Sequence, residues 1–347
     1  SAASDVYKRQ ELARSTGVPL LPASVRLDAD GDAGLDAAAA EAGYPLLVKA
    51  VAGGGGIGMH RVDGPAELAT VVESTRSMAL RAFGDGTVFL ERYIPKARHI
   101  EIQVFGVGGG EAVHLYERDC SLQRRFQKVI EESPAPLLPD PVRRRMAEAA
   151  VALCRASGYR SAGTVEFIVD ADTFEFFFLE MNTRIQVEHA VTEMVTGRDL
   201  VTMQIELAQR RLAPVEQAAI ESRGHAIECR LYAENPAKMF MPSPGRLDVF
   251  RPPPAAADLR IETGYREGDT VTPFYDPMLA KVIAHGASRD EARARCADAL
   301  RRFSIEGVRH NRDFLVACLL DPQFAAGDVS TGFIENRRES LLAASGR

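Results

Sequence analysis

The sequence contains no apolar run close to the roughly 18 residues that a membrane-spanning helix requires. It also shows no basic and then apolar leader that ends at a small-residue cleavage site. We therefore expect neither a membrane span nor a secretory leader, and no membrane partner.

Cysteine is scarce: the five cysteines stand at positions 120, 154, 229, 296 and 318, and no two of them form a CxxC pair. An odd, scattered set argues against a disulfide framework and against a zinc knuckle. This usage favours a reducing compartment, and we expect the protein in the cytoplasm.

A basic excess is missing as well, since the formal net charge is −6. A nucleic-acid-binding protein usually presents a basic face, so we expect no nucleic-acid partner. What is present is a chain of 347 residues, 46% of them hydrophobic. This is ample for a buried core, and the length indicates two or three domains.

Hydrophobic periodicity and turn residues predict a mixture of helices and strands. Period-2 alternation over residues 99–104 predicts a strand on which His99, Glu101 and Gln103 share one face. Two strands separated by Asp170-Ala171-Asp172 indicate an antiparallel hairpin. The predicted elements are strands at 44–50, 89–93, 163–169 and 174–182, helices at 11–15, 65–78 and 199–211, a helix with Asp140 as its N-cap that closes at Gly158, and a helix that a Ser288–Glu291 capping box opens and that reaches about residue 302.

The hairpin carries a candidate metal site. Glu180 and Asn182 are two residues apart on one strand, so their side chains leave the same face, and Glu166 on the preceding strand can meet them. Two carboxylates and an amide oxygen form the hard oxygen set that Mg²⁺ prefers. The alternative is a surface acidic pair without an ion.

The polar alternation continues beyond the metal set through Arg184, Gln186 and Glu188, beside an apolar row. We expect these residues to line a channel rather than to form a solvated edge. Arg184 offers a rigid fork of donors for a carboxylate-like or phosphate-like anion. Glu188 is placed to act as a base on what Arg184 holds.

A glycine-rich segment at residues 53–58 follows Lys49. Glycines let backbone N–H groups approach phosphate oxygens closely, and Lys49 supplies a point charge at the end of a strand. The lysine precedes the glycines, so this is not a Walker A loop, and a plain flexible turn stays an alternative. Residues 117–128 form a third candidate segment, dense in polar and basic groups; its alternative is a charged loop.

With these three segments in this order, the chain closely resembles the biotin carboxylase component of biotin-dependent acyl-CoA carboxylases, which is an ATP-grasp enzyme. The resemblance runs from about Glu11 to the C-terminus, and four long motifs at matching spacing make it very specific. They are Arg98-His99-Ile100-Glu101-Ile102-Gln103, residues 180–188, Gly224-His225-Ala226-Ile227-Glu228-Cys229-Arg230 and Tyr275-Asp276-Pro277-Met278.

The resemblance implies a role for each matching residue. The ATP-phosphate positions are Lys49, Gly55 and Gly56, and the nucleotide-binding positions are Glu91, Arg92 (where a lysine is common), Tyr93, Ile94, His99 and Gln123. The Mg²⁺ or Mn²⁺ ligands are Glu166, Glu180 and Asn182. The bicarbonate-binding positions are Lys128, Arg184, Gln186 and Val187; Glu188 is the base that deprotonates bicarbonate, and Arg230 steadies the biotin enolate.

The implied reaction begins with ATP and bicarbonate, which form carboxyphosphate. Carboxyphosphate yields CO₂ and phosphate, and N1 of a biotin attached to a carrier protein captures the CO₂. The implied partners are bicarbonate, the biotin carboxyl carrier protein, a carboxyltransferase subunit and a second copy of the chain in a homodimer. Which acyl-CoA finally receives the carboxyl group is not set by this sequence, because that choice belongs to the carboxyltransferase.

The implied fold is α+β: an ATP-grasp fold, made of a small α/β lid and a larger antiparallel-sheet domain, followed by the biotin carboxylase C-terminal domain. We place a non-native leader and linker remnant at residues 1–20, the lid at 21–95, the central subdomain at 96–215 and the C-terminal domain at 216–347. The glycine loop of the lid is expected to be mobile without nucleotide.

The chain departs from the family pattern at three places. Phe126 stands where a polar residue near the nucleotide is usual, and Ile57 stands where many relatives have a basic residue. The family's N-terminal domain of about 110 residues is expected to be absent. Two alternatives to biotin carboxylation therefore stay open: an ATP-grasp ligase acting on another carboxylate, and a truncated, non-catalytic ATP-grasp fragment.

Overall fold

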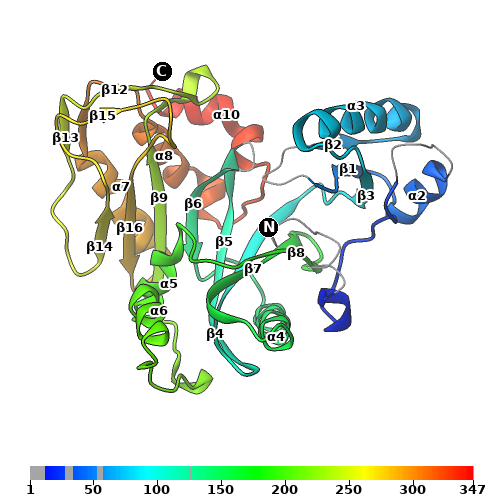
Figure 1. Cartoon of the computed structure of the whole chain (residues 1–347). Coiled ribbons are helices and arrows are strands. Elements are labelled where there is room, and N and C mark those ends of the chain that lie inside the picture. The colour runs from blue at the N-terminus through cyan, green and yellow to red at the C-terminus, as the bar shows by residue number, and fades with distance from the viewer. Residues whose placement is uncertain (1–11, 28–33, 53–57, 125–126, 347) are drawn as a thin grey trace. The chain divides into compact units, whose positions relative to one another are not determined.

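The computed structural model describes residues 12–27, 34–52, 58–124 and 127–346 (Figure 1). Within these ranges no helix is both long enough and apolar enough to cross a membrane. The chain divides into two compact units. The first comprises residues 1–97 and 165–181, and the second comprises residues 98–164 and 182–347.

The first unit contains a three-stranded antiparallel sheet in the order β2-β1-β3, on which α2 and α3 pack through an apolar core. The predicted strands at 44–50 and 89–93 are confirmed within two residues, and the predicted helix at 65–78 continues to Phe83, where Gly84 ends it with a positive φ of 75°. The elements are α2 (Leu35–Ala42), β1 (Leu46–Ala50), β2 (Met59–Val62), α3 (Pro65–Phe83) and β3 (Val88–Arg92).

The predicted hairpin is confirmed as β7 (Arg160–Asp170) and β8 (Phe176–Asn182), which are neighbouring strands joined by a short turn. Residues 165–170 of β7 and most of β8 belong to the first unit. In the turn, the amide of Phe174 donates to the carbonyl of Asp170. The hairpin therefore forms where the Asp-Ala-Asp signal placed it.

The second unit is built on a sheet that contains strands in the order β14-β16-β9-β6-β5-β4, and Figure 1 shows β9, β6 and β5 side by side. All neighbouring strands along this order pair antiparallel. These strands are β4 (Ala97–Gly108), β5 (Glu111–Arg124), β6 (Gln127–Ser133), β9 (His225–Tyr232), β14 (Leu259–Glu262) and β16 (Met278–Gly286).

The helices of this unit include α4, α5, α6, α7 and α10, and smaller strand pairs complete it. Asp140 is the first residue of α4 rather than its N-cap, because the helix starts directly after Pro139 and has no side-chain cap. The remaining elements are α4 (Asp140–Ala156), α5 (His189–Thr196), α6 (Leu200–Ala208), η1 (Gln217–Ala219), β10 (Glu234–Asn235), η2 (Pro236–Lys238), β11 (Met241–Pro242), β12 (Gly245–Arg246), β13 (Val249–Arg251), β15 (Thr270–Val271), α7 (Arg289–Arg302), β17 (Ser304–Glu306), α8 (Arg312–Leu320), α9 (Pro322–Ala325) and α10 (Phe333–Ala344).

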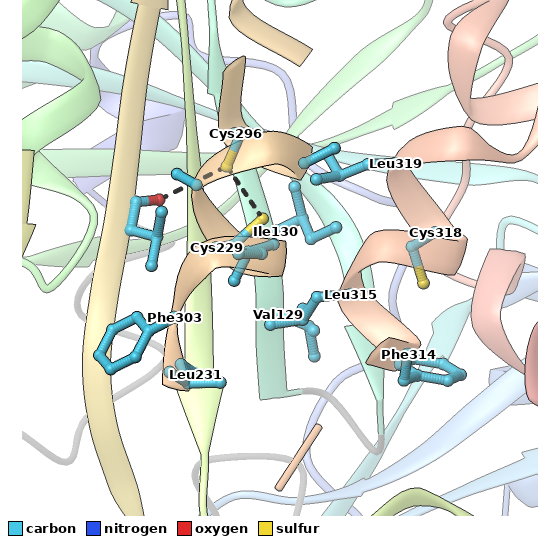
Figure 2. Close-up of a cluster of buried hydrophobic side chains, with 14 of the residues drawn as sticks. Val129, Ile130, Cys229, Leu231, Cys296, Phe303, Phe314, Leu315, Cys318 and Leu319 are labelled. Atoms are coloured by element: carbon cyan, nitrogen blue, oxygen red, sulfur yellow. Dashed lines mark hydrogen bonds between the residues drawn. The ribbon is translucent and has the colours of Figure 1, made fainter. Parts of the chain in front are cut away.

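The side chains of strand β9 alternate with period 2, so one face of the strand packs into the apolar core and the other face carries polar residues. Ile227, Cys229 and Leu231 belong to a core cluster that includes residues of α7 and α8. Figure 2 shows Cys229 and Leu231 in this cluster, with the thiol of Cys229 3.6 Å from that of Cys296. The intervening Glu228 and Arg230 are buried as well. Since they alternate with the core residues, they lie on the opposite face of the sheet.

Helix α7 is fixed to the sheet by a buried ionic contact as well as by the core. Arg289, in its first turn, donates through Nη2 and Nε to the two carboxylate oxygens of Glu132 on β6, at 2.9 and 2.6 Å. His225 of β9 lies 2.7 Å from the same carboxylate. The predicted cap of this helix is confirmed, because the Ser288 hydroxyl accepts from the amide of Glu291.

Candidate active site

The polar row that begins at Glu180 does not continue as a strand. β8 ends at Asn182, residues 183–188 have no helix or strand, and α5 begins at His189. The strand therefore ends at Asn182, as predicted, and the polar row beyond it does not lie on a strand. Gln186 and Glu188 are buried, whereas Arg184 is exposed and its Nη1 donates to the carbonyl of Ile185.

Glu188 is held at the end of this segment by two cations from neighbouring strands. Lys128 Nζ of β6 lies 2.5 Å from Oε1, and Arg230 Nη2 of β9 lies 3.0 Å from Oε2. Burial raises the pKa of Glu188, but the charges of Lys128, Arg230 and Arg118 outweigh it, and the net pKa is below the ordinary value. Glu188 is thus an ionised carboxylate in a nearly dry site.

The same two cations contact further carboxylates. Lys128 Nζ donates to Glu101 of β4 at 2.7 Å, and Arg230 Nε lies 2.6 Å from Glu131 of β6. Desolvation raises the pKa of Glu131 to about 7, although Arg230 opposes that shift. The cluster therefore contains two carboxyl groups whose pKa values are shifted in opposite directions, that of Glu188 downwards and that of Glu131 upwards.

Arg118 of β5 lies behind this cluster and is fully buried. Its guanidinium lies 2.6 Å from Glu101, and it also donates to the side-chain oxygens of Gln103 at 2.7 Å, Thr192 at 2.9 Å and Gln186 at 3.1 Å. The planar guanidinium of Arg118 donates to several acceptors at once, in a geometry that the ammonium group of a lysine does not match.

Two cations were missed by the residue-by-residue assignment from sequence. Arg118 lies inside the polar segment at 117–128 but was assigned no role. Glu101 lies on the polar face of a buried strand, and a buried carboxylate requires a cation as its partner. Lys281 of β16 donates to the carbonyl of Val187 at 2.6 Å. No local pattern marks Lys281, which is 94 positions from that carbonyl in the sequence.

Of the predicted nucleotide-binding residues, His99 and Gln123 come together in the second unit. Gln123 Nε2 donates to His99 Nδ1 at 2.9 Å, and both side chains are buried between β4 and β5. Phe126 lies outside the described residues.

In the first unit, Lys49 and Glu91 meet on adjacent strands. Lys49 Nζ donates to Glu91 Oε2 at 2.7 Å and lies 5.4 Å from the centre of the Phe89 ring. Arg92 Nε donates to the carbonyl of Ala42 at 3.1 Å, and the guanidinium of Arg61 lies over the Tyr93 ring. Ile94 is half-buried. The described residues do not include Gly55, Gly56 and Ile57, so the mobility of the glycine loop stays a prediction.

The predicted metal ligands are placed by the hairpin. Glu166 of β7 is buried, and Glu180 and Asn182 of β8 are half-buried. Glu166 and Glu180 belong to the first unit, and Asn182 is the first residue after the boundary. The meeting of the three side chains around one ion stays a prediction.

Comparison with known proteins gives two profile matches that together cover most of the chain. The profile described as "Carbamoyl-phosphate synthase L chain, ATP binding domain" matches residues 5–213. The profile described as "Biotin carboxylase C-terminal domain" matches residues 228–336.

Curated relatives include proteins of two lengths. The chain is 47% identical over 327 residues to the mitochondrial methylcrotonoyl-CoA carboxylase subunit alpha of Dictyostelium discoideum, covering 94% of this chain and 46% of that protein. It is 44% identical over 326 residues to biotin carboxylase 1 of Bacillus subtilis, covering 94% of this chain and 72% of that protein. The chain thus spans about half the length of the methylcrotonoyl-CoA carboxylase subunits that it matches.

Solved structures match over almost the whole chain. The biotin carboxylase domain dimer of Hydrogenobacter thermophilus 2-oxoglutarate carboxylase, in complex with MgADP, ADP and bicarbonate, has a TM-score of 0.91 at 38% identity, covering 97% of this chain and 74% of that one. A Campylobacter jejuni biotin carboxylase with a bound ATP analogue has a TM-score of 0.90 at 40% identity, covering 96% of this chain and 74% of that one.

Proposed function

This chain belongs to the biotin carboxylase family of ATP-dependent ligases with the ATP-grasp fold, and from this premise we propose that it carboxylates biotin with bicarbonate. ATP first converts bicarbonate to carboxyphosphate, with release of ADP. Carboxyphosphate then breaks down to phosphate and CO₂, which N1 of biotin captures. The product is carboxybiotin, the carboxyl donor of an acyl-CoA carboxylase.

The placement of Glu188 carries the proposal. A base for bicarbonate must be ionised, and Lys128 and Arg230 keep Glu188 in that state despite its burial. Lys128 and Arg230 would also favour an anion beside the carboxylate. Arg230 contacts Glu188, the proposed proton acceptor. A biotin enolate bound beside Glu188 would therefore also lie within reach of Arg230.

The first unit supplies the proposed phosphate contact. Lys49 forms an ion pair with Glu91, and an exchange of that carboxylate for phosphate oxygens would bring the Lys49 side chain onto ATP. The hairpin residues Glu166, Glu180 and Asn182 offer only hard oxygen donors, which fits Mg²⁺ or Mn²⁺. A divalent ion bound there supplies positive charge that offsets the charge developing on the ATP phosphates.

The proposed partners follow from the same family. They are a biotin carboxyl carrier protein, a carboxyltransferase subunit and a second copy of the chain, and a dimer is what the Hydrogenobacter domain forms. The methylcrotonoyl-CoA carboxylase relatives support an acyl-CoA as the final acceptor. Five free, buried cysteines support the cytoplasm as the compartment.

The test is ATP hydrolysis by the purified chain with Mg²⁺, bicarbonate and free biotin present or omitted. We expect hydrolysis that requires bicarbonate, and a Glu188→Gln variant slower by about 10²- to 10⁴-fold, the usual contribution of a general base. Glu221→Gln, at an exposed ion pair with Arg223, serves as the matched control and keeps wild-type activity.

Equal rates for wild type and Glu188→Gln would contradict the proposal. Activity with another carboxylic acid in place of bicarbonate would point to a different ATP-grasp ligase. Absence of Mg-ATP binding in calorimetry would point to a non-catalytic fragment.

A further inference from the structure

The irregular segment that carries Gln186, Val187 and Glu188 has no helix or sheet ladder to fix its backbone. Cations of the sheet instead hold each of the three residues. Arg118 of β5 holds the side chain of Gln186, and Lys281 of β16 holds the main-chain carbonyl of Val187. Lys128 of β6 and Arg230 of β9 hold the carboxylate of Glu188.

Lys281 differs from the other cations because it touches only the backbone of the segment. Its Nζ lies 2.6 Å from the Val187 oxygen, 2.5 Å from Glu262 and 4.0 Å from Glu228. The carboxylate of Glu262 balances the ammonium charge, which leaves another of its three N–H donors for the carbonyl. The contact is therefore a built anchor inside the unit and not a surface encounter, since Lys281 is only 9% exposed.

The restrained carbonyl belongs to the peptide that links Val187 to Glu188. Holding this peptide plane limits the rotation that would swing the Glu188 side chain away from Lys128 and Arg230. Arg230 is also the cross-strand partner of Lys281 in the β9–β16 register. The anchor and one of the cations that it serves are thus adjacent on one face of the sheet.

We propose that Lys281 is a positioning residue for the bicarbonate site: through the Val187 carbonyl it sets where the catalytic base points. This role rests on the proposed function, and Lys281 itself touches no reacting atom. A purely structural role, as the counter-ion of Glu262 and Glu228, is the competing explanation. The two differ in which kinetic constant responds to its removal.

The experiment compares Lys281→Met and Lys281→Arg with wild type in bicarbonate-dependent ATP hydrolysis. Misplacing a catalytic group by about 1 Å costs up to about 100-fold in rate, and we expect Lys281→Met to lower kcat/KM for bicarbonate by on the order of 10-fold. KM for ATP should stay within about 2-fold, since uniform damage would move both constants. Lys281→Arg should recover most of the loss, because arginine also donates to a carbonyl and pairs with Glu262.

Two controls separate positioning from charge and from stability. The double variant Lys281→Met/Glu262→Gln removes the uncompensated carboxylate but still lacks the donor, so its kcat/KM for bicarbonate should remain low. Arg289→Met breaks a comparably buried ion pair, that of Glu132, away from the 183–188 segment. It should lower the urea midpoint and leave kcat/KM for bicarbonate unchanged.

A KM for ATP that rises in parallel with the loss, or an unchanged kcat/KM for bicarbonate in Lys281→Met, would overturn the positioning role. A crystal structure of Lys281→Met gives a second, activity-independent readout, in which we expect a displaced Val187 carbonyl; an undisplaced one would overturn the role as well. Wild-type chain that hydrolyses no ATP with bicarbonate counts against the proposed function itself, and the crystal structure then decides on Lys281 alone.

Discussion

Replacing Glu132 by glutamine should lower the free energy of unfolding at neutral pH by about 3 kcal/mol. Burial alone raises the pKa of this carboxyl group, but the hydrogen bonds from His225 and Arg289 and their charges lower it from 4.5 to about 2. The difference between those two pKa values corresponds to about 3 kcal/mol of interaction that the ionised form gains on folding.

The sign of the pH dependence follows from the lowered pKa. Between about pH 4.5 and about pH 2 the unfolded chain binds more protons than the folded one, so this contribution is present above pH 4.5 and is lost as the pH falls towards 2. At pH 3 less than half of it, about 1.4 kcal/mol, should remain.

Urea unfolding followed by far-UV circular dichroism measures the effect in wild type and Glu132→Gln at several pH values. Asp298→Asn is the matched control, because Asp298 forms an exposed ion pair with Arg302 within one helix and should cost less than about 0.5 kcal/mol. A difference between wild type and Glu132→Gln that is the same at pH 7 and pH 3 would refute the reasoning.

Two further outcomes are expected. Gly106→Ala should destabilise the chain by about 1–3 kcal/mol in thermal unfolding, because the added Cβ would lie 2.2 Å from the Tyr159 carbonyl oxygen. Gly264→Ala is the control, because a Cβ at that position meets nothing within 4 Å. Equal melting temperatures of the two variants would contradict the prediction. All five cysteines are buried free thiols, and burial raises the pKa of Cys120, Cys154, Cys229 and Cys318. An aromatic disulfide reagent at pH 8 should therefore label none of the five thiols in the native state and all five in urea. Rapid labelling of the native chain would show that the core opens.

Local patterns predicted most of the elements that carry the site. Strict alternation over residues 99–104 placed His99, Glu101 and Gln103 on one face of β4, and that face does meet Gln123, Lys128 and Arg118. The capping box at Ser288 fixed the start of α7 within one residue. These signals are reliable because their cause lies within a few residues of their effect.

The path of residues 183–188 could not be read in the same way. An alternating polar and apolar row is typical of a strand, but here buried side-chain contacts rather than a ladder fix the backbone after Asn182. Arg118 is 68 positions from Gln186, and Lys281 is 94 positions from Val187. Contacts at such separations depend on strand order and register, which no local pattern encodes.

The anchoring of Glu188 has a consequence for the order in which the protein folds during synthesis. The segment at 183–188 leaves the ribosome before β9 and β16, which provide Arg230 and Lys281. Strand β6 can pair with β5 as soon as it is made, but its other edge stays unpaired until β9 follows, because Ile130 pairs with Cys229. The base therefore cannot be held by all of its partners until the chain has been made through β16, and in a shorter nascent chain the acidic residues of the site have Arg118 and Lys128 but lack Arg230 and Lys281.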